Sequence, residues 1–171
     1  MALQKPNLSV VLPCYNEAQG LSRLLERYAD TGRGRAFELI LVDNGSTDKT
    51  ATTLQELLPR YPFARSVRVV QNQGYGFGVL SGLLAARGEV LAWSHADLQT
   101  DAADVFRAYD VYCQAPDATH ILVKGRRTGR ALGQWLISRC MELVACVCLR
   151  HPCPESNAQP KLFHREIASL A

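Results

Sequence analysis

The sequence predicts an α/β fold in three layers, with helices on both faces of a mostly parallel β-sheet. Short apolar runs rich in β-branched residues alternate with longer segments of helical periodicity, which is the pattern of βαβ units. Polar loops follow four of these runs, as expected where parallel strands end at a ligand-binding edge. The 171 residues, 47% of them apolar and 20% charged, fit one soluble domain with a buried core.

Five apolar runs are predicted to form the strands. Each is bounded by polar or turn-forming residues, and the β-branched content favours strands over short helices. They read LSVVL, FELILV, SVRVV, EVLAW and HILVK and occupy residues 8–12, 37–42, 66–70, 89–93 and 120–124.

The segments between the strands are predicted to form helices that cover the sheet. Leucines at helical spacing give the first segment one apolar face. The second is expected to open with a Ser or Thr N-cap and to end before Pro59, whose ring restricts the preceding residue. The four helices are expected at 17–29, 46–58, 79–87 and 102–114.

The polar loops are expected to outline one site, because parallel strands point their carboxyl ends in the same direction. In chain order they read PCYNE, DNGSTD, NQGYGFG and HADLQTD. The first lacks the G-x-G-x-x-G of a dinucleotide site, and the chain has no Walker A loop, which argues against dehydrogenases and P-loop enzymes. Asp43 is placed to accept hydrogen bonds from a base or a ribose, whereas Ser46, Thr47 and Asp48 favour a turn into the next helix.

The stretches VVLPCYNEAQGL, LILVDNGSTDKT, NQGYGFGVLSGL and VLAWSHADLQTD together resemble the nucleotide-sugar-binding half of glycosyltransferase family 2, inverting enzymes of the GT-A fold. Within it, the sequence is most similar to dolichyl-phosphate and polyprenyl-phosphate hexose synthases. The resemblance covers residues 8–127, and four ordered motifs are more specific than any one. It implies one catalytic domain over 1–171, with a nucleotide-sugar-binding half at 8–115 and an acceptor-side half at 119–171.

The resemblance implies roles for residues of the donor site. Asp97 would bind a divalent cation, Mg²⁺ or Mn²⁺, on the diphosphate of the nucleotide sugar, with Gln99 beside the cation. Asp43 would contact the base. The other residues implied to bind the nucleotide sugar are Pro13, Tyr15, Glu17, Gly74 and His95.

His95 departs from the family pattern, which has an Asp-Ala-Asp-Leu-Gln stretch here. A diphosphate brings its own oxygen ligands, so Asp97 with substrate oxygens and water can complete the shell of the cation. Three interpretations of His95 stay open: a residue bonded to a neighbouring loop, a donor contact, or a metal ligand that tolerates Mn²⁺ better than Mg²⁺. Asp101 and Asp104 are expected to start the next helix.

A basic stretch after the fifth strand is expected to form the acceptor side. Lys124, Arg126, Arg127 and Arg130 lie within seven residues of a chain whose net charge is only +3. Arginine binds phosphate through a bidentate fork, and the intervening glycines let the backbone approach a ligand. The alternative is a solvated basic loop.

The family resemblance implies that this basic stretch binds a lipid phosphate. Similar enzymes carry a Lys-Gly-x-Arg stretch for the phosphate of a polyprenyl carrier, so Arg126 and Arg127 would hold the acceptor in line with the sugar and join Asp97 in catalysis. ESNAQPKLFHR, residues 155–165, resembles an Asn-Ala-Gln-Pro segment of bacterial relatives. It implies acceptor contacts for Gln159 and Lys161, as the basic stretch does for Lys124.

The chain is expected to be cytoplasmic, with peripheral membrane contact. Six cysteines without a C-x-x-C pair, and no secretory signal before the first strand, indicate reduced thiols. The apolar run at 143–149 is far shorter than the roughly 20 residues that cross a bilayer. Apolar positions 132, 135, 136, 140, 143 and 147 have helical spacing and either pack in a core or lie in the membrane interface.

These features predict an inverting, metal-dependent glycosyltransferase that moves a hexose from a UDP- or GDP-linked sugar to a polyprenyl or dolichyl phosphate. A phosphate nucleophile is already ionised near neutral pH, so no strong general base is required. The alternative is a non-catalytic nucleotide-sugar-binding module, favoured by His95 and by the further sequence that follows the 155–165 motif in relatives. Nucleic-acid binding is not expected, because the basic stretch lacks interleaved aromatic residues.

Overall fold

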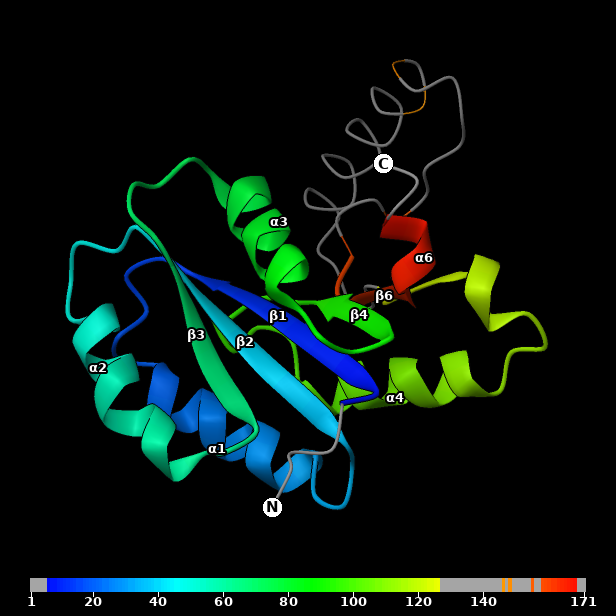
Figure 1. The fold of residues 1–171 in the computed structure, drawn as a ribbon, viewed down its shortest axis with the longest axis horizontal. Coiled ribbons are helices and arrows are strands. Elements are labelled where there is room, and N and C mark those ends of the chain that lie inside the picture. Colours follow the sequence, from blue (N-terminus) through cyan, green and yellow to red (C-terminus); the bar gives the residue numbers. More distant parts are fainter. Residues whose placement is uncertain (1–5, 127–145, 147, 149–154, 156–157, 169–171) are drawn as a thin grey trace, which may run out of the picture.

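The computed structural model of the chain describes residues 6–126, 146, 148, 155 and 158–168. In this part, a sheet lies between two layers of helices, which confirms the expected three-layer architecture (Figure 1). Arg127, Arg130 and the apolar positions between 132 and 147 named above lie outside the described residues. The strands are β1 (Leu8–Cys14), β2 (Phe37–Asn44), β3 (Ala64–Val69), β4 (Val90–Trp93), β5 (Leu122–Lys124) and β6 (Lys161–His164).

The strand order is β3-β2-β1-β4-β6-β5. The first four strands are parallel, and β1 pairs with both β2 and β4. The chain steps outward from β1 to β3 and then crosses back to place β4 on the other side of β1. In such sheets, ligands bind beside the carboxyl ends of the strands at this reversal of direction.

The strand β6 was not expected from the sequence. It lies between β4 and β5 and runs antiparallel to both, with Lys161 opposite Trp93 on one side and opposite Lys124 on the other. A run of four residues that begins with Lys and ends with His has too little alternation to predict a strand. Its position brings the end of β4, the 159–161 segment and the end of β5 to the same edge of the sheet.

The longer helices divide between the two faces of the sheet (Figure 1). Helices α1 (Leu21–Thr31), α2 (Thr50–Leu57) and α4 (Ala102–Cys113) pack on one face, and α3 (Tyr75–Ala85) packs on the other. Short turns of 3₁₀-helix follow α2 at Leu58–Arg60 and precede β5 at Ala118–His120, and α6 is Arg165–Ala168. Among the described residues, no helix has the length and apolar content needed to span a membrane.

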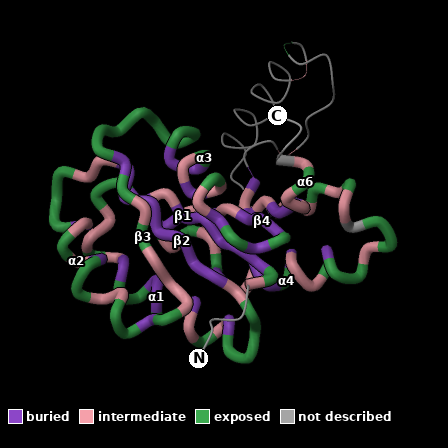
Figure 2. Tube along the Cα trace, in the orientation of Figure 1, coloured by how far each residue is buried: buried purple, intermediate pink, exposed green. Residues whose placement is uncertain are grey.

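The core lies on the central strands, where buried residues are concentrated (Figure 2). Alternate residues of β1 face opposite layers, so that Val10 packs toward α1, α2 and α4 while Val11 packs toward α3. Helix α3 approaches the sheet through Gly82, where a Cβ would collide with Val11 and Val42. Close packing at this glycine fixes the height of α3, and therefore of its first turn, above the sheet.

Three helices differ from the predicted bounds at their first turn. Helices α1 and α2 begin later than expected, at Leu21 and Thr50, and α3 begins earlier, at Tyr75. The polar residues before α1 and α2 bond to each other instead of continuing the helices. The N-cap of α2 is Lys49 without a side-chain cap bond, so the predicted Ser or Thr cap was wrong.

Candidate functional site

Asn16 connects the loop after β1 to the loop after β2 through hydrogen bonds. This residue has φ 59°, its side-chain oxygen accepts from the backbone N–H of Thr47 at 2.9 Å, and its own N–H donates to Ser46 Oγ at 3.1 Å. Asparagine tolerates this left-handed conformation better than most residues. The neighbouring Tyr15 is 46% exposed at the edge of the sheet.

Glu17 lies at the same junction. Its backbone N–H donates to Thr50 Oγ1 at 2.9 Å, and Asp48 accepts from the Thr50 N–H at 2.8 Å. Ser46, Thr47 and Asp48 therefore form the predicted turn. Burial raises the pKa of the Glu17 carboxyl, and the negative charges of Asp97 and Asp48 raise it further. The Asp97 charge contributes to this raised pKa, so the carboxylates of the first and fourth loops interact electrostatically.

Asp43 is 2% exposed at the end of β2. Its Oδ1 accepts from the Ser46 N–H at 3.0 Å, while its Oδ2 accepts no hydrogen bond and lies 3.9 Å from Nε of Arg68. A buried carboxylate oxygen without a donor is costly. This oxygen could therefore be satisfied by a ligand N–H or hydroxyl, which is the chemistry predicted for Asp43.

The loop after β3 is held against the end of β2. Asn44 Nδ2 donates to the Gly74 carbonyl at 3.0 Å, and the Gly74 N–H donates to Asn72 Oδ1 at 2.8 Å. Gly45, at φ 72°, passes so close to the Asn72 backbone that a Cβ would collide with it. Gly74 itself has φ 94° and leads directly into α3, which explains why glycine stands at both positions.

The loop after β4 carries His95 and Asp97. The Gln99 N–H donates to Asp97 Oδ1 at 3.0 Å, which orients an exposed carboxylate. Asp101 accepts from the Ala103 N–H at 3.1 Å and caps α4, as expected, and Asp104 lies in the first turn.

His95 contacts the first residue of α3 through its ring. The centroids of the His95 and Tyr75 rings are 5.4 Å apart, and the planes are inclined by 33°. Burial and the nearby Asp97 charge raise the pKa of the Tyr75 hydroxyl to about 12, so this phenol stays protonated at neutral pH. His95 therefore packs its ring on the first residue of α3, and its three sequence-based interpretations stay predictions.

Asp97 fits a cation whose ligands come largely from a substrate. Among the described residues, no group of three or more His, Cys, Asp or Glu side chains is arranged to hold a metal ion. Mg²⁺ is commonly held by one or two carboxylates together with phosphate oxygens and water. The exposed Asp97 carboxylate, with Glu17 as its acidic neighbour, suits this kind of site.

The two segments predicted to bind the acceptor lie together. The Gly125 N–H donates to the Pro160 carbonyl at 2.8 Å, and a Cβ on Gly125 would collide with the Gln159 carbonyl oxygen. Strand pairing sets Lys124 opposite Lys161. The exposed Arg126 follows directly, so several cationic residues gather at the edge of the sheet that also carries Asp97.

Trp93 was predicted only as a strand residue, but it contacts the acceptor-side segment. With the Gln159 amide oriented to satisfy both partners, its nitrogen donates to the Trp93 carbonyl at 3.0 Å, and its oxygen accepts from the indole Nε1–H at 3.3 Å. The sequence feature that could have indicated this contact is a tryptophan at the last position of a strand that leads into a polar loop.

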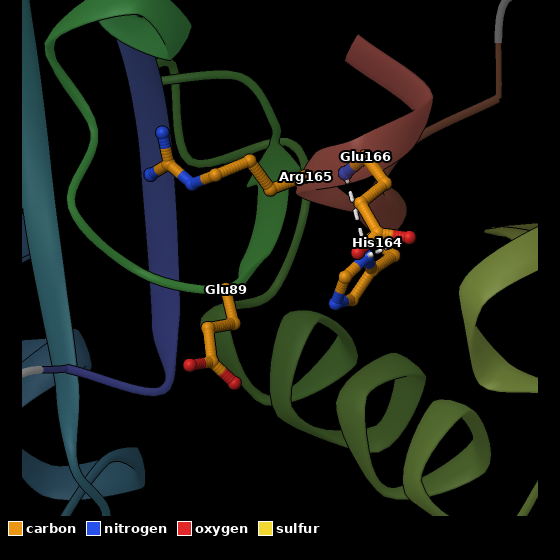
Figure 3. A pocket seen from close by; sticks show the side chains of 4 residues that line it. All are labelled: Glu89, His164, Arg165 and Glu166. Atoms are coloured by element: carbon orange, nitrogen blue, oxygen red, sulfur yellow. Dashed lines mark hydrogen bonds and ion pairs between the residues drawn. The ribbon is translucent and has the colours of Figure 1, made fainter. Parts of the chain in front are cut away.

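A cavity of about 550 Å³ lies at the opposite ends of β4 and β6, away from these loops (Figure 3). Its lining residues are Glu89, His164, Arg165 and Glu166. The Arg165 guanidinium donates to the carbonyls of Ala86 and Gly88 at 2.7 and 2.8 Å. These bonds tie α6 to the turn before β4, so the role of Arg165 is structural.

Comparison with known proteins assigns the family. The model of the family described as glycosyl transferase family 2 matches residues 9–156. The chain belongs to glycosyl transferase family 2. It is 32% identical over 141 residues to the undecaprenyl-phosphate 4-deoxy-4-formamido-L-arabinose transferase of Edwardsiella ictaluri, a match covering 80% of this chain and 42% of that protein. The chain thus spans less than half the length of this curated relative.

Solved structures confirm that this family 2 member has the expected GT-A fold. Glucosyl-3-phosphoglycerate synthase from Mycobacterium tuberculosis, in complex with phosphoglyceric acid, superposes with a TM-score of 0.72 at 22% identity, covering 94% of this chain and 57% of that one. A mannosyltransferase from Pyrobaculum calidifontis, in complex with GDP-Man and Mn²⁺, gives 0.68 at 21% identity, covering 98% and 47%.

Proposed function

We propose that this family 2 member transfers a hexose from a nucleoside diphosphate sugar to a polyprenyl phosphate, with inversion at the anomeric carbon. One observation carries the proposal: Asp97 and the cationic 124–126 and 159–161 segments lie at the same edge of the sheet. An acidic site for a cation–diphosphate complex next to a basic site for a phosphate suits a reaction that joins two anionic substrates. The name of the Edwardsiella relative includes undecaprenyl phosphate, which supports the acceptor class.

The donor side would bind the nucleotide through Asp43 and Tyr15. The buried Asp43 Oδ2 needs a donor, which a base N–H or a ribose hydroxyl provides. Exposed Tyr15 offers a ring face at the same edge. Asp97 would hold a divalent cation, with Gln99 beside it, and that cation would offset the charge that develops on the leaving nucleoside diphosphate.

The acceptor side would hold the lipid phosphate through Arg126, Lys124 and Lys161, with Arg127 as a further predicted contact. A phosphate oxygen attacks C1 of the sugar from the face opposite the diphosphate, and the C1–O bond to the diphosphate breaks as the new bond forms. The bond electrons leave with the nucleoside diphosphate. The protein supplies proximity and charge rather than a strong base. A lipid-linked acceptor would bring the chain to the cytoplasmic face of a membrane as a peripheral protein.

The test is direct transfer of label. Purified protein is incubated with radiolabelled UDP- or GDP-sugars, Mn²⁺ or Mg²⁺, and a short polyprenyl phosphate, and the lipid phase is analysed for labelled product. We expect labelled lipid that disappears with a chelator, and an anomeric configuration opposite to that of the donor by NMR. Saturable donor binding without any labelled lipid would support the alternative, a nucleotide-sugar-binding module.

A further inference from the structure

We propose that Trp93 is a positioning residue that holds the acceptor segment 159–161 at a fixed place relative to the loop that carries Asp97. The inference rests on the proposed function, because it assigns a support for the acceptor side of the same site. It also changes the role of Gln159 from a direct contact with the acceptor to a connection between the acceptor segment and the indole.

Trp93 is fixed at its backbone and at its ring. It is the last residue of β4, and the next residue, Ser94, still donates its N–H to the Val11 carbonyl of β1 at 3.1 Å. The indole packs against Phe163 of β6, with centroids 5.8 Å apart and planes inclined by 80°, beside the apolar cluster under α3. The half-buried ring is therefore held from the core side, and its free rotation is restricted.

Gln159 uses both ends of its amide on this one residue. The amide nitrogen donates to the Trp93 carbonyl at 3.0 Å, and the amide oxygen accepts from the indole Nε1–H at 3.3 Å. An amide engaged in this way is fixed in position and direction. The Gln159 side chain therefore ties the residue before Pro160 to Trp93, in addition to the pairing of β6 with β4.

Two further contacts extend this support to the cations. Lys161 places its ammonium 5.3 Å from the centroid of the Trp93 ring, a cation–π distance. Gly125 lies against the Gln159 carbonyl without space for a Cβ and donates to the Pro160 carbonyl. The position of Arg126 is therefore linked through Gly125 and the 159–161 segment to Trp93.

The Asp97 loop begins at the same residue, since Ser94 follows Trp93 directly. Transfer requires the phosphate oxygen and C1 to meet at about 3–3.5 Å, and a displacement of about 1 Å can reduce the rate by about 100-fold. Trp93 contacts the acceptor segment, and the loop that carries Asp97 begins at the next residue. The position of the acceptor cations relative to Asp97 is thus set by the pairing of β6 with β4 and by the Trp93 side chain, which fixes the 159–161 segment at the start of β6.

The experiment measures donor and acceptor kinetics separately in the full chain, with a short polyprenyl phosphate as acceptor. Trp93→Phe keeps an aromatic ring beside Phe163 but cannot donate to Gln159, and Trp93→Leu also removes the ring beneath Lys161. We expect the KM for the acceptor to rise about tenfold with Phe and further with Leu, whereas the Kd for the nucleotide sugar stays within about twofold. Leu83→Ala is the control, because it removes packing from the same apolar cluster without touching the 159–161 segment.

A double-mutant cycle tests the connection itself. If the indole acts through Gln159, Trp93→Phe combined with Gln159→Ala should weaken acceptor binding little more than Gln159→Ala alone. Additive effects would overturn the inference, as would a Trp93→Leu protein that transfers sugar with an unchanged acceptor KM. If the wild-type protein transfers no sugar at all, the proposed function fails and this inference fails with it. If the wild type is active and the variants keep its acceptor KM, only the inference fails.

Discussion

Tyr75 and His95 pack ring against ring, with centroids 5.4 Å apart, although Tyr75 begins α3 and His95 lies in the loop after β4. The contact lies beside Asp97, whose charge contributes to the raised pKa of Tyr75. At position 95, where the family resemblance implies an acid, this chain has a histidine whose ring packs on Tyr75. Compared with an acid at this position, His95 leaves one negative charge fewer in the loop that carries Asp97.

We predict that His95→Asp strengthens cation binding. The new carboxylate adds a hard oxygen ligand, so Mn²⁺ or Mg²⁺ should bind the protein–nucleoside diphosphate complex on the order of tenfold more tightly, with the larger gain for Mg²⁺. Calorimetric titration with each metal in the presence of nucleoside diphosphate measures this directly. His95→Asn, which loses the ring without gaining charge, should show no such gain. Equal metal affinities for the Asp and Asn variants would contradict the prediction.

Asp97→Asn is predicted to abolish metal-dependent binding of the donor. The amide keeps the size of the side chain but loses the charge that a divalent cation requires. The measurement is nucleotide-sugar affinity with and without Mn²⁺, which should become equal in the variant.

A matched control for this variant lies in the same loop. Asp101 caps α4 through the Ala103 N–H, so Asp101→Ala should lower the free energy of unfolding by about 1 kcal/mol and leave the Mn²⁺ dependence intact. If both variants lost the metal effect, the loss would reflect disruption of the loop, and the assignment of Asp97 would not survive.

Much of the fold was predictable because its signals are local. The strands that carry the donor loops are β-branched runs. The turn at Ser46, Thr47 and Asp48 follows from the Asp43 and Asp48 carboxylates, which accept from the nearby N–H groups of Ser46 and Thr50. The starts of α1 and α2 could not be predicted in this way, because the residues before these helices bond across loops, as Asn16 does with Thr47. Pairings between distant segments leave no trace in a short window of sequence.

The acceptor side illustrates this limit. The basic character of Lys124 and Arg126 is visible in the sequence, and the likeness of 155–165 to a family segment suggested a common role. Neither feature indicates that β6 inserts between β4 and β5, or that Gln159 bonds to Trp93. These contacts depend on tertiary packing, which local propensity does not encode.

Arg126→Ala is predicted to weaken binding of the acceptor and to leave binding of the donor unchanged. Arg126 is exposed beside Gly125 at the acceptor edge, and loss of a charge-assisted bond to phosphate should raise the KM for polyprenyl phosphate about tenfold. Donor affinity, measured by titration without acceptor, should be unchanged. Arg107→Ala removes an exposed arginine paired with Asp104 on α4 and serves as the control. A parallel loss of donor affinity would place Arg126 on the other side of the reaction.

The stability of the fold should depend on the buried carboxylate of Glu38, near the start of β2 and far from the loops of the candidate site. Glu38 Oε1 accepts from Ser9 Oγ and from the Arg87 N–H, each at 2.6 Å, and Oε2 accepts from Arg65 Nε at 3.0 Å. Burial alone would raise the pKa of this carboxyl, but the hydrogen bonds and the positive charge of Arg65 outweigh it, so the pKa is lowered from its usual 4.5. The ionised form therefore stabilises the fold.

A lowered pKa in the folded state means that this stabilisation is fully present above pH 4.5 and is lost as the pH falls through the folded pKa. Glu38→Gln should therefore reduce the free energy of unfolding by about 2 kcal/mol at pH 7, because its amide cannot accept all three bonds. The deficit should shrink when urea unfolding is repeated below the folded pKa, where the wild-type carboxyl is also neutral. Glu26→Gln, on the exposed face of α1, should differ little from wild type at either pH. A deficit of the same size at both pH values would show that lost packing, not lost charge, explains the destabilisation.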